Sequence, residues 1–299
     1  MLTNIYIKES AIEAGFDLVG VTFPQHFEQN RLAHEEWIER GAADSLEYMQ
    51  RYMDVRFNPA NLMEGARSVV VCALNYKNVY SLNQGSSDHP KIASYALSVD
   101  YHKVIRKQLK ALLRKLQQAS PTLQGRCCVD TAPLLEKQLA VEAGLGWIGR
   151  QSLLITPQHG SFVLLGVLIL SDEVDNYDSP LEAAGCGQCR LCIESCPCGA
   201  ILANRTLDSR LCISALTVEC DTCHGRQLSG WLFGCDQCQS CCPHNRHTPL
   251  ATNPAITPIF QPPSKEKWLS MSPEEFSQNL GTTPLKRGGL LRLQRNCLK

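Results

Sequence analysis

The chain has 299 residues, 44% of them hydrophobic, and its 29 basic and 29 acidic side chains give a formal net charge of zero. This length and composition allow about two domains with ample core, and no apolar run is long enough to cross a membrane. The balanced charge excludes a protein that holds a polyanion over its whole surface, so any such partner must be held by a local patch.

The N-terminal part is predicted to alternate helices and strands. Helical periodicity, short apolar runs and unbroken apolar runs predict, in order, a helix over 4–14, a strand over 18–21, a buried strand over 68–74, an amphipathic helix over 101–118 and an apolar strand over 161–170. These elements predict one α/β or α+β domain.

Composition changes mark the expected domain boundaries. The stretch 172–185 is rich in Asp, Glu, Pro and Gly and is predicted to be a linker. Six of the 16 prolines lie between 243 and 263, which indicates an extended connector before a short helical tail. We therefore expect three parts, namely a catalytic domain over 1–172, a cysteine-rich domain over 173–245, and a Pro-rich connector with a basic helical tail over 246–299.

Twelve of the 16 cysteines lie between Cys186 and Cys242. The first run follows the pattern C-x2-C-x2-C-x3-C-P and comprises Cys186, Cys189, Cys192 and Cys196. This is the spacing by which bacterial ferredoxins hold a [4Fe–4S] cluster, and in two-cluster proteins the fourth cysteine of the run binds the other cluster. A second group of ligands is therefore expected downstream.

The second group is Cys235-x2-Cys238-x3-Cys242-Pro243, and Cys212 completes the eight ligands. Cys242 is preferred to Cys241 because it has the x3 spacing and the following proline that Cys196 has. The prediction is a crossed assignment of two [4Fe–4S] clusters. The first cluster takes Cys186, Cys189, Cys192 and Cys242, and the second takes Cys196, Cys212, Cys235 and Cys238.

Zinc and disulfides are the alternatives to clusters. Cys220-x2-Cys223-His224 resembles half of a zinc ribbon, but zinc needs only four ligands at a site, whereas the triple run followed by C-P is specific to clusters. No charged-then-apolar leader is visible at the start of the sequence, so a reducing compartment, the cytoplasm, is expected rather than a disulfide framework. The sequence gives no assignment for four further thiols, which are Cys198, Cys220, Cys223 and Cys241.

Clusters pass single electrons, so a second cofactor is expected in the first domain for the harder chemical step. The segment Gly15–Gly20 reads GFDLVG and fails the G-x-G-x-x-G pattern of dinucleotide binding. The glycine-rich stretch Gly144–Arg150 is the remaining candidate for close backbone approach to a large ligand. By itself it is explained equally well as a helix C-cap and turn.

Five segments together resemble the epoxyqueuosine reductase family over nearly the whole chain and in the family's order. They are Asp100–Arg106, Val129–Arg150, Cys186–Ile201, Leu211–Glu219 and Phe233–Asn245. The resemblance implies an α+β fold, with an α/β-type cobalamin-binding domain like those of nitroreductases and reductive dehalogenases, joined to a ferredoxin-like domain with two [4Fe–4S] clusters. It implies the last step of queuosine synthesis, in which the epoxide on the wobble base of tRNA is reduced to the cyclopentene.

Asp130 matches the family's proposed proton donor, in the motif V-D-T. From its local context alone it is better explained as a polar residue near a helix start at Pro133, and the resemblance reverses that preference. Removing the epoxide oxygen as water consumes two electrons and two protons, and a positioned acid must deliver protons. Because an ordinary aspartate with a pKa of about 3.9 is a poor acid at neutral pH, we expect burial beside the cofactor to raise the pKa of Asp130.

Further roles follow only from the resemblance. It places cobalamin contacts at Arg56, Tyr101, His102, Asp130, Gln151, Ser214 and Gln239. Arg150-Gln151 replaces the family's more usual Lys-Asn, so the contacts of that loop are a departure from the pattern. No D-x-H-x-x-G motif is present, so cobalamin is expected to bind without a protein imidazole on its cobalt.

A basic C-terminal segment is the expected tRNA contact. From Phe276 onward the sequence has five positive and no acidic side chains, and the tRNA contacts are expected at Lys286, Arg287, Arg292 and Arg295. Many family members continue into a helical-repeat extension that cradles tRNA, which this sequence lacks, so binding should depend on the basic tail and fall steeply with salt. A solvated helix face near a terminus explains the same charges equally well.

Two other classes of protein fit parts of the pattern. One is a cobalamin and iron–sulfur reductase of a small molecule, similar to reductive dehalogenases, and the other is a ferredoxin-like electron carrier. Under the preferred interpretation the chain is a monomeric oxidoreductase. Its expected partners are tRNA and an external low-potential electron donor of the ferredoxin or flavodoxin type.

Overall fold

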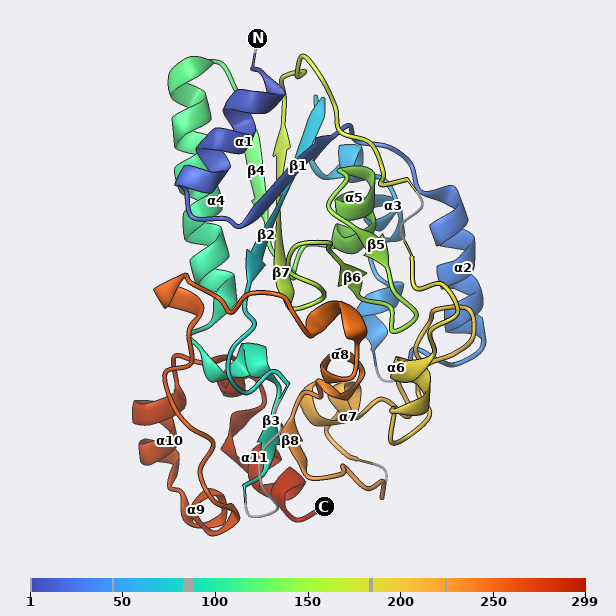
Figure 1. Ribbon diagram of the computed structural model, residues 1–299, viewed down its shortest axis with the longest axis vertical. Coiled ribbons are helices and arrows are strands. Elements are labelled where there is room, and N and C mark those ends of the chain that lie inside the picture. The colour runs from blue at the N-terminus through green and yellow to red at the C-terminus, as the bar shows by residue number, and fades with distance from the viewer. Residues whose placement is uncertain (1, 45, 83–88, 183–184, 224) are drawn as a thin grey trace.

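The computed structural model describes residues 2–44, 46–82, 89–182, 185–223 and 225–299. A four-stranded antiparallel sheet with strand order β1-β2-β7-β4 lies at the centre of the N-terminal part (Figure 1). The strands are β1 Leu18–Thr22, β2 Ser68–Asn75, β7 Val163–Leu170 and β4 Gly125–Cys128. The antiparallel pairing confirms the α+β class and the strands that the apolar runs predict.

Helices cover both faces of this sheet, which explains why β2 is buried along its whole length. On one face α1 Asn4–Glu13 and α4 Tyr101–Ala119 pack against alternate residues of β2 and β7, including Val70, Cys72 and Leu168. On the other face α5 Glu136–Glu142 packs against the intervening residues, including Val71 and Ile169. The predicted helices over 4–14 and 101–118 are confirmed within a residue or so.

Helix α4 brings its first turn to the edge of a pocket because its buried stripe fixes its rotation on the sheet. Ile105, Leu109, Leu112 and Leu116 are fully buried at helical spacing. The helix approaches β7 closely at Gly166, where an added Cβ would lie 2.5 Å from the Cγ2 atom of Ile105. The start of α4 is therefore held at the end of the sheet that faces the cysteine-rich part of the chain.

Shorter elements surround this core. They are α2 Glu28–Glu39, α3 Met53–Arg56, the hairpin β5 Trp147–Ile148 and β6 Leu154–Ile155, and, in the cysteine-rich part, α6 Leu191–Glu194, α7 Ile213–Val218 and α8 Gln237–Ser240. The linker predicted over 172–185 contains no helix or strand among its described residues. None of the helices in the described ranges combines the length and apolarity needed to cross a bilayer.

After the Pro-rich stretch, the C-terminal helices form a second core. Helices α9 Lys265–Ser270, α10 Pro273–Leu280 and α11 Gly289–Cys297 pack around Trp268 and Leu293, which are both fully buried. The parallel strand pair β3 Lys91–Ile92 and β8 Trp231–Phe233 joins this core (Figure 1). Residues near 91–97, expected within the first domain, therefore pack with the last fifty residues of the chain.

Candidate active site and cluster sites

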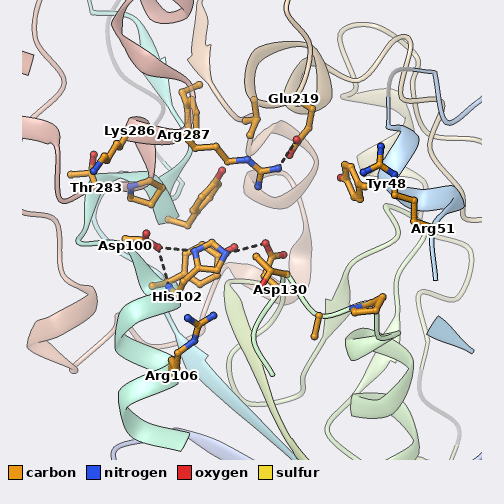
Figure 2. A pocket seen from close by; sticks show the side chains of 18 of the residues that line it. Tyr48, Arg51, Asp100, His102, Arg106, Asp130, Glu219, Thr283, Lys286 and Arg287 are labelled. Carbon is orange, nitrogen blue, oxygen red and sulfur yellow. Dashed lines mark hydrogen bonds and ion pairs between the residues drawn. The ribbon is translucent and has the colours of Figure 1, made fainter. Parts of the chain in front are cut away.

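A pocket of about 900 Å³ opens where several segments meet (Figure 2). Most of its wall comes from the start of α4, the loop that follows β4, residues 48–56, and the short helix Pro284–Arg287. Of the predicted site residues, the pocket brings together Arg56, Tyr101, His102, Asp130, Lys286 and Arg287. Residues from four distant parts of the sequence thus share one concave surface.

A carboxylate–imidazole–carboxylate chain crosses one wall of the pocket (Figure 2). Asp100 caps α4 by accepting a hydrogen bond from the backbone N–H of His102 at 3.1 Å, and its Oδ1 atom lies 2.7 Å from Nδ1 of the same ring. The Nε2 atom of His102 lies 3.0 Å from Oδ2 of Asp130. When both carboxylates are ionised they can only accept hydrogen bonds, so both ring nitrogens donate and His102 is an imidazolium.

The electrostatics of the chain agree with that assignment. The hydrogen bond to Asp130 raises the pKa of His102 above its ordinary value, against burial, which lowers it. Burial pushes the pKa of Asp130 upward, but the hydrogen bond and charge of His102 and the charge of Arg287 hold the net pKa below its ordinary value. The expectation of a raised pKa for Asp130 is therefore wrong. Burial does act in that direction, but the neighbouring cations outweigh it, because the side chain is still 44% exposed.

Glu136, the first residue of α5, supports Asp130 and was absent from the sequence-based predictions. Its Oε1 atom accepts a hydrogen bond from the backbone N–H of Asp130 at 2.8 Å. Burial, reinforced by the nearby charge of Asp130, raises the pKa of Glu136 to about 8. Asp130 has a positive φ of 48° and lies outside α5, so it is not the helix-start residue of the structural alternative.

The glycine-rich segment before Gln151 is explained by local packing. Gly144 has a φ of 72° directly after the end of α5, which is the ordinary position for a helix-ending glycine. An added Cβ at Gly146 would lie 2.1 Å from the carbonyl oxygen of Ile155, so this glycine permits the β5–β6 hairpin. The segment thus matches the C-cap and turn alternative and presents Gln151 as a buried side chain.

A second cavity, of about 250 Å³, contains thiols. Cys196, Cys212, Cys235 and Cys238 all line it, and these are the four ligands predicted for the second cluster. Burial raises the pKa of Cys235 to about 12, and the charges of Cys212 and Cys196 add to the rise, as proximity of the three thiols requires. Residues that lie far apart in the two cysteine runs are thus brought to one cavity.

The other four predicted ligands are also neighbours. Burial and the charges of Cys241, Cys186 and Cys242 raise the pKa of Cys192 to about 11. Burial raises the pKa of Cys242 as well, and Cys186 and Cys189 contribute to that rise. The grouping is the one that the crossed assignment predicts, with the spare thiol Cys241 close by.

Within the described residues, no three or more Cys, His, Asp or Glu side chains converge as the ligands of a single metal ion would. Cys220 and Cys223 are buried in a small apolar cluster with Leu216 and Leu228, and His224, the third member of the zinc-like motif, lies outside the described residues.

A buried network of hydrogen bonds holds the thiol cavity against the central sheet. Gln239 donates to Tyr76 Oη at 3.1 Å and to Asp236 Oδ1 at 3.0 Å, and its own Oε1 accepts from Ser161 Oγ at 3.0 Å. Asn245 accepts from the backbone N–H of Ser161 at 2.7 Å and donates to the carbonyl of Gln239 at 2.7 Å. The network connects the second cysteine run to β2 and to the segment before β7.

The seven residues expected to contact cobalamin divide between the two cavities. Arg56, Tyr101, His102 and Asp130 line the larger pocket, and Gln151, Ser214 and Gln239 line the smaller one. Tyr95 lines both, so the cavities adjoin. Arg56 Nε and Gln151 Nε2 are buried and lack a hydrogen-bond partner within the described structure, so each cavity offers a donor to a polar ligand. The residues present therefore fit a large polar cofactor that spans both cavities.

The predicted basic contacts also divide into two pairs. Lys286 and Arg287 line the larger pocket, where Arg287 forms an ion pair with Glu219 at 2.6 Å. Arg292 pairs with Asp221 at 2.7 Å and is only 17% exposed, and Arg295 donates to the carbonyl oxygens of Cys220 and Asp221. The second pair therefore holds α11 to the segment 218–221, and only the first pair faces the pocket.

Comparison with known proteins connects these sites to one family. A family model described as "Epoxyqueuosine reductase QueG, DUF1730" matches residues 56–131, and one described as "4Fe-4S double cluster binding domain" matches residues 185–245. Epoxyqueuosine reductase of Cyclobacterium marinum is 37% identical over 295 residues, which cover 97% of this chain and 94% of that protein.

Solved structures extend the likeness to the fold. Epoxyqueuosine reductase from Streptococcus thermophilus matches with a TM-score of 0.87 and 27% identity, over 98% of this chain and 79% of that one. An epoxyqueuosine reductase bound to an epoxyqueuosine-modified tRNA-Tyr stem loop matches with a TM-score of 0.85, 27% identity and the same coverage. A catabolic reductive dehalogenase shares the fold alone, with a TM-score of 0.51 and 16% identity over 98% of this chain and 37% of that one.

Proposed function

This chain belongs to the epoxyqueuosine reductase family, and on that premise we propose that it reduces epoxyqueuosine at the wobble position of tRNA to queuosine, with Asp130 as the group that protonates the departing oxygen. It is an oxidoreductase with a double-cluster domain. The observation that carries the proposal is the Asp100–His102–Asp130 chain, which lies in a pocket that adjoins the cavity of cluster-type thiols.

The protons that the reaction consumes suggest roles for His102 and Asp130. Converting the epoxide to an alkene and water takes two electrons and two protons. Because the pKa of Asp130 lies below its ordinary value, its carboxyl group is ionised at neutral pH and holds no proton of its own. The imidazolium of His102 supplies one of the two protons, which passes through Oδ2 of Asp130 to the oxygen that leaves, and solvent water supplies the second.

Asp100 and Tyr101 keep the imidazole in place for this transfer. Asp100 accepts from Nδ1 and so directs Nε2 toward Asp130. The Tyr101 ring stacks on the imidazole, with centroids 4.1 Å apart and an interplanar angle of 25°. Glu136 holds the backbone N–H of Asp130, so the carboxyl group is positioned from two sides.

The cofactors that we propose are cobalamin, held across the two cavities, and the two [4Fe–4S] clusters. When bound, the clusters supply single electrons from an external ferredoxin or flavodoxin, and cobalamin supplies reducing power at the substrate. Arg56 and Gln151 offer it their unpartnered buried donors. Among the residues that line the larger pocket, Lys286 and Arg287 are the cations that we assign to the phosphates of the tRNA.

Eight thiolate ligands must stay reduced for the clusters to form, so we propose that the enzyme acts in the cytoplasm. We propose that the protein acts as a monomer.

Anaerobic reconstitution with iron, sulfide and cobalamin, followed by turnover on an anticodon stem-loop that carries epoxyqueuosine, tests this function. Asp130→Asn should retain iron, sulfide and cobalamin yet lower kcat by about 10²- to 10⁴-fold, the usual contribution of a positioned acid. Asp130→Asn turning over at the wild-type rate would remove Asp130 from the mechanism.

The same preparation separates the alternative functions. A simple electron carrier would show the broad absorption of clusters without cobalamin bands. A reductase of small molecules would dehalogenate an aryl halide and leave the modified stem-loop unchanged.

A further inference from the structure

Two exposed tyrosines lie on the wall of the active-site pocket. All eight tyrosines are within the described residues, and only Tyr48 and Tyr52 are exposed, at 45% and 70%. Both line the pocket. A large aromatic ring left in water is costly unless something covers it, so the coincidence of the two exposed rings with the pocket needs an explanation.

The backbone at Tyr52 gives a second, independent reason to examine it. Tyr52 has φ 56° and ψ 41°, the left-handed conformation that a bulky side chain seldom adopts. It occupies the N-cap position of α3, yet its side chain makes no capping hydrogen bond. Strain of this kind is common at functional sites, and the Tyr52 side chain is 70% exposed instead of packed in a core.

The surroundings of Tyr52 match the backbone of a nucleic acid. The neighbouring Arg51 is 63% exposed and lies 3.4 Å from Glu47, which is itself 80% exposed. In Figure 2, Arg51 and Tyr48 lie on one side of the pocket and Lys286 and Arg287 on the opposite side, with Asp130 between them. Aromatic rings flanked by exposed cations are the usual platform for single-stranded nucleic acid.

We propose that Tyr52 is a specificity-determining residue that stacks on the base adjacent to epoxyqueuosine in the anticodon loop. This inference rests on the proposed function. A base that enters the pocket leaves its neighbour in the loop without a stacking partner, and an aromatic ring at the pocket mouth replaces that partner. Tyr52 thereby favours a target base in an RNA loop over the same base as a free nucleoside.

The flanking base is a better occupant for this ring than cobalamin. The unpartnered donors that suit the cofactor, Arg56 Nε and Gln151 Nε2, are buried, and the second of them faces the thiol cavity. Tyr52 by contrast lines only the larger pocket and is the most exposed tyrosine of the chain.

The test compares Tyr52→Ala and Tyr52→Phe on epoxyqueuosine-bearing stem-loops, with Phe23→Ala as a control for an exposed aromatic ring (48%) that does not line the pocket. Tyr52→Ala should lower kcat/KM by about 5- to 100-fold, mostly through KM, as loss of one base–aromatic stack predicts. Tyr52→Phe keeps the ring and should stay within about twofold of wild type, as should Phe23→Ala.

Stem-loops with an abasic nucleotide at position 33 or 35 identify the stacked base. One of the two should lower the wild-type kcat/KM to the level of Tyr52→Ala, and the substitution should then cost nothing further on that loop. Tyr52→Gly should bind RNA as weakly as Tyr52→Ala while its thermal midpoint is unchanged or higher, because glycine adopts this backbone conformation without strain.

Equal kcat/KM for wild type and Tyr52→Ala on the intact stem-loop would overturn the inference, and so would loss of cobalamin from Tyr52→Ala, which would assign the ring to the cofactor. Should wild type reduce none of these loops, the proposed function fails instead. The Kd of the stem-loop for wild type and Tyr52→Ala then still tests the stack by itself.

Discussion

The two adjoining cavities of this protein differ in the charge of their linings. The larger pocket is lined by many charged groups, and three of them, His102, Asp130 and Arg287, act on one another. The thiol cavity is lined by cysteines, tyrosines, amides and apolar side chains such as Leu153 and Ile201. Among the described residues that line it, Asp236 alone belongs to the Asp, Glu, His, Lys and Arg types, and burial raises its pKa.

Under the proposed function, this difference would separate two kinds of transfer. A proton moves between atoms in hydrogen-bond contact, and the groups that carry it need charged partners that displace their pKa values. The potential of a cluster depends on the charges and hydrogen bonds around it, and the thiol cavity has few ionisable side chains besides its cysteines. Tyr95, shared by both cavities, is the boundary between these environments.

The largest effect is expected from removing a cluster ligand near the thiol cavity. Cys242→Ala removes a predicted ligand and should lower the iron content from about eight to about four atoms per chain, with loss of all turnover. Its neighbour Cys241→Ala is the matched control, since that thiol has no ligand role in the crossed assignment. Iron and acid-labile sulfide analysis after anaerobic reconstitution measures both. Loss of iron from Cys241→Ala but not from Cys242→Ala would show that Cys241, and not Cys242, is the ligand.

Asn245→Ala tests whether the amide network is structural. Asn245 is fully buried, and its removal leaves the backbone N–H of Ser161 without an acceptor. We expect the free energy of unfolding to fall by about 1–3 kcal/mol, the cost of one unsatisfied buried group, without a direct effect on the proton chain. Urea unfolding of the reconstituted protein measures the loss, and unchanged stability would show that water replaces the amide.

Glu136→Gln tests the raised pKa of a buried carboxyl group beside the larger pocket. The folded-state pKa of Glu136, about 8, lies above its ordinary value of 4.5, so the unfolded chain releases this proton first and stability falls as pH rises from about 4.5 to 8. Glutamine keeps an acceptor for the N–H of Asp130 without titrating. The variant should match wild type at pH 4 and have the higher melting temperature at pH 8. A difference of the opposite sign at pH 8 would mean that the carboxylate is stabilised by its surroundings.

Lys286→Ala and Arg292→Ala are expected to have the smallest and most distinct effects. Lys286 is exposed at the pocket, so its loss should reduce the slope of log Kd against log salt for the stem-loop by about one and leave stability unchanged. Arg292 is paired with Asp221, so its loss should lower the melting temperature and leave the salt slope unaltered. Equal salt slopes for both variants and wild type would exclude the phosphate role of Lys286.

Patterns that lie within one stretch of sequence predicted the strands. The strands over 18–21, 68–74 and 161–170 follow from apolar runs that must be buried on one or both faces of a sheet. The assignment of Cys196, Cys212, Cys235 and Cys238 to one cluster rests on run spacing and stays a prediction, which their lining of one cavity supports. Packing of the last fifty residues with β3 left no such local pattern and was missed.

The cysteine spacing alone predicted the type of ligand and the pairing of the two runs, because it depends on neighbours a few residues away, whereas Asp130 was singled out by the family resemblance and not by its local context. The protonation of the pocket depends on contacts that only the folded chain makes. His102 and Asp130 are 28 residues apart, and Glu136 reaches the Asp130 backbone only after the loop turns through a positive φ. A pKa depends on which charges lie within a few ångströms, and that distance is set by how α4, α5 and the C-terminal core pack together, so no local pattern could have fixed it.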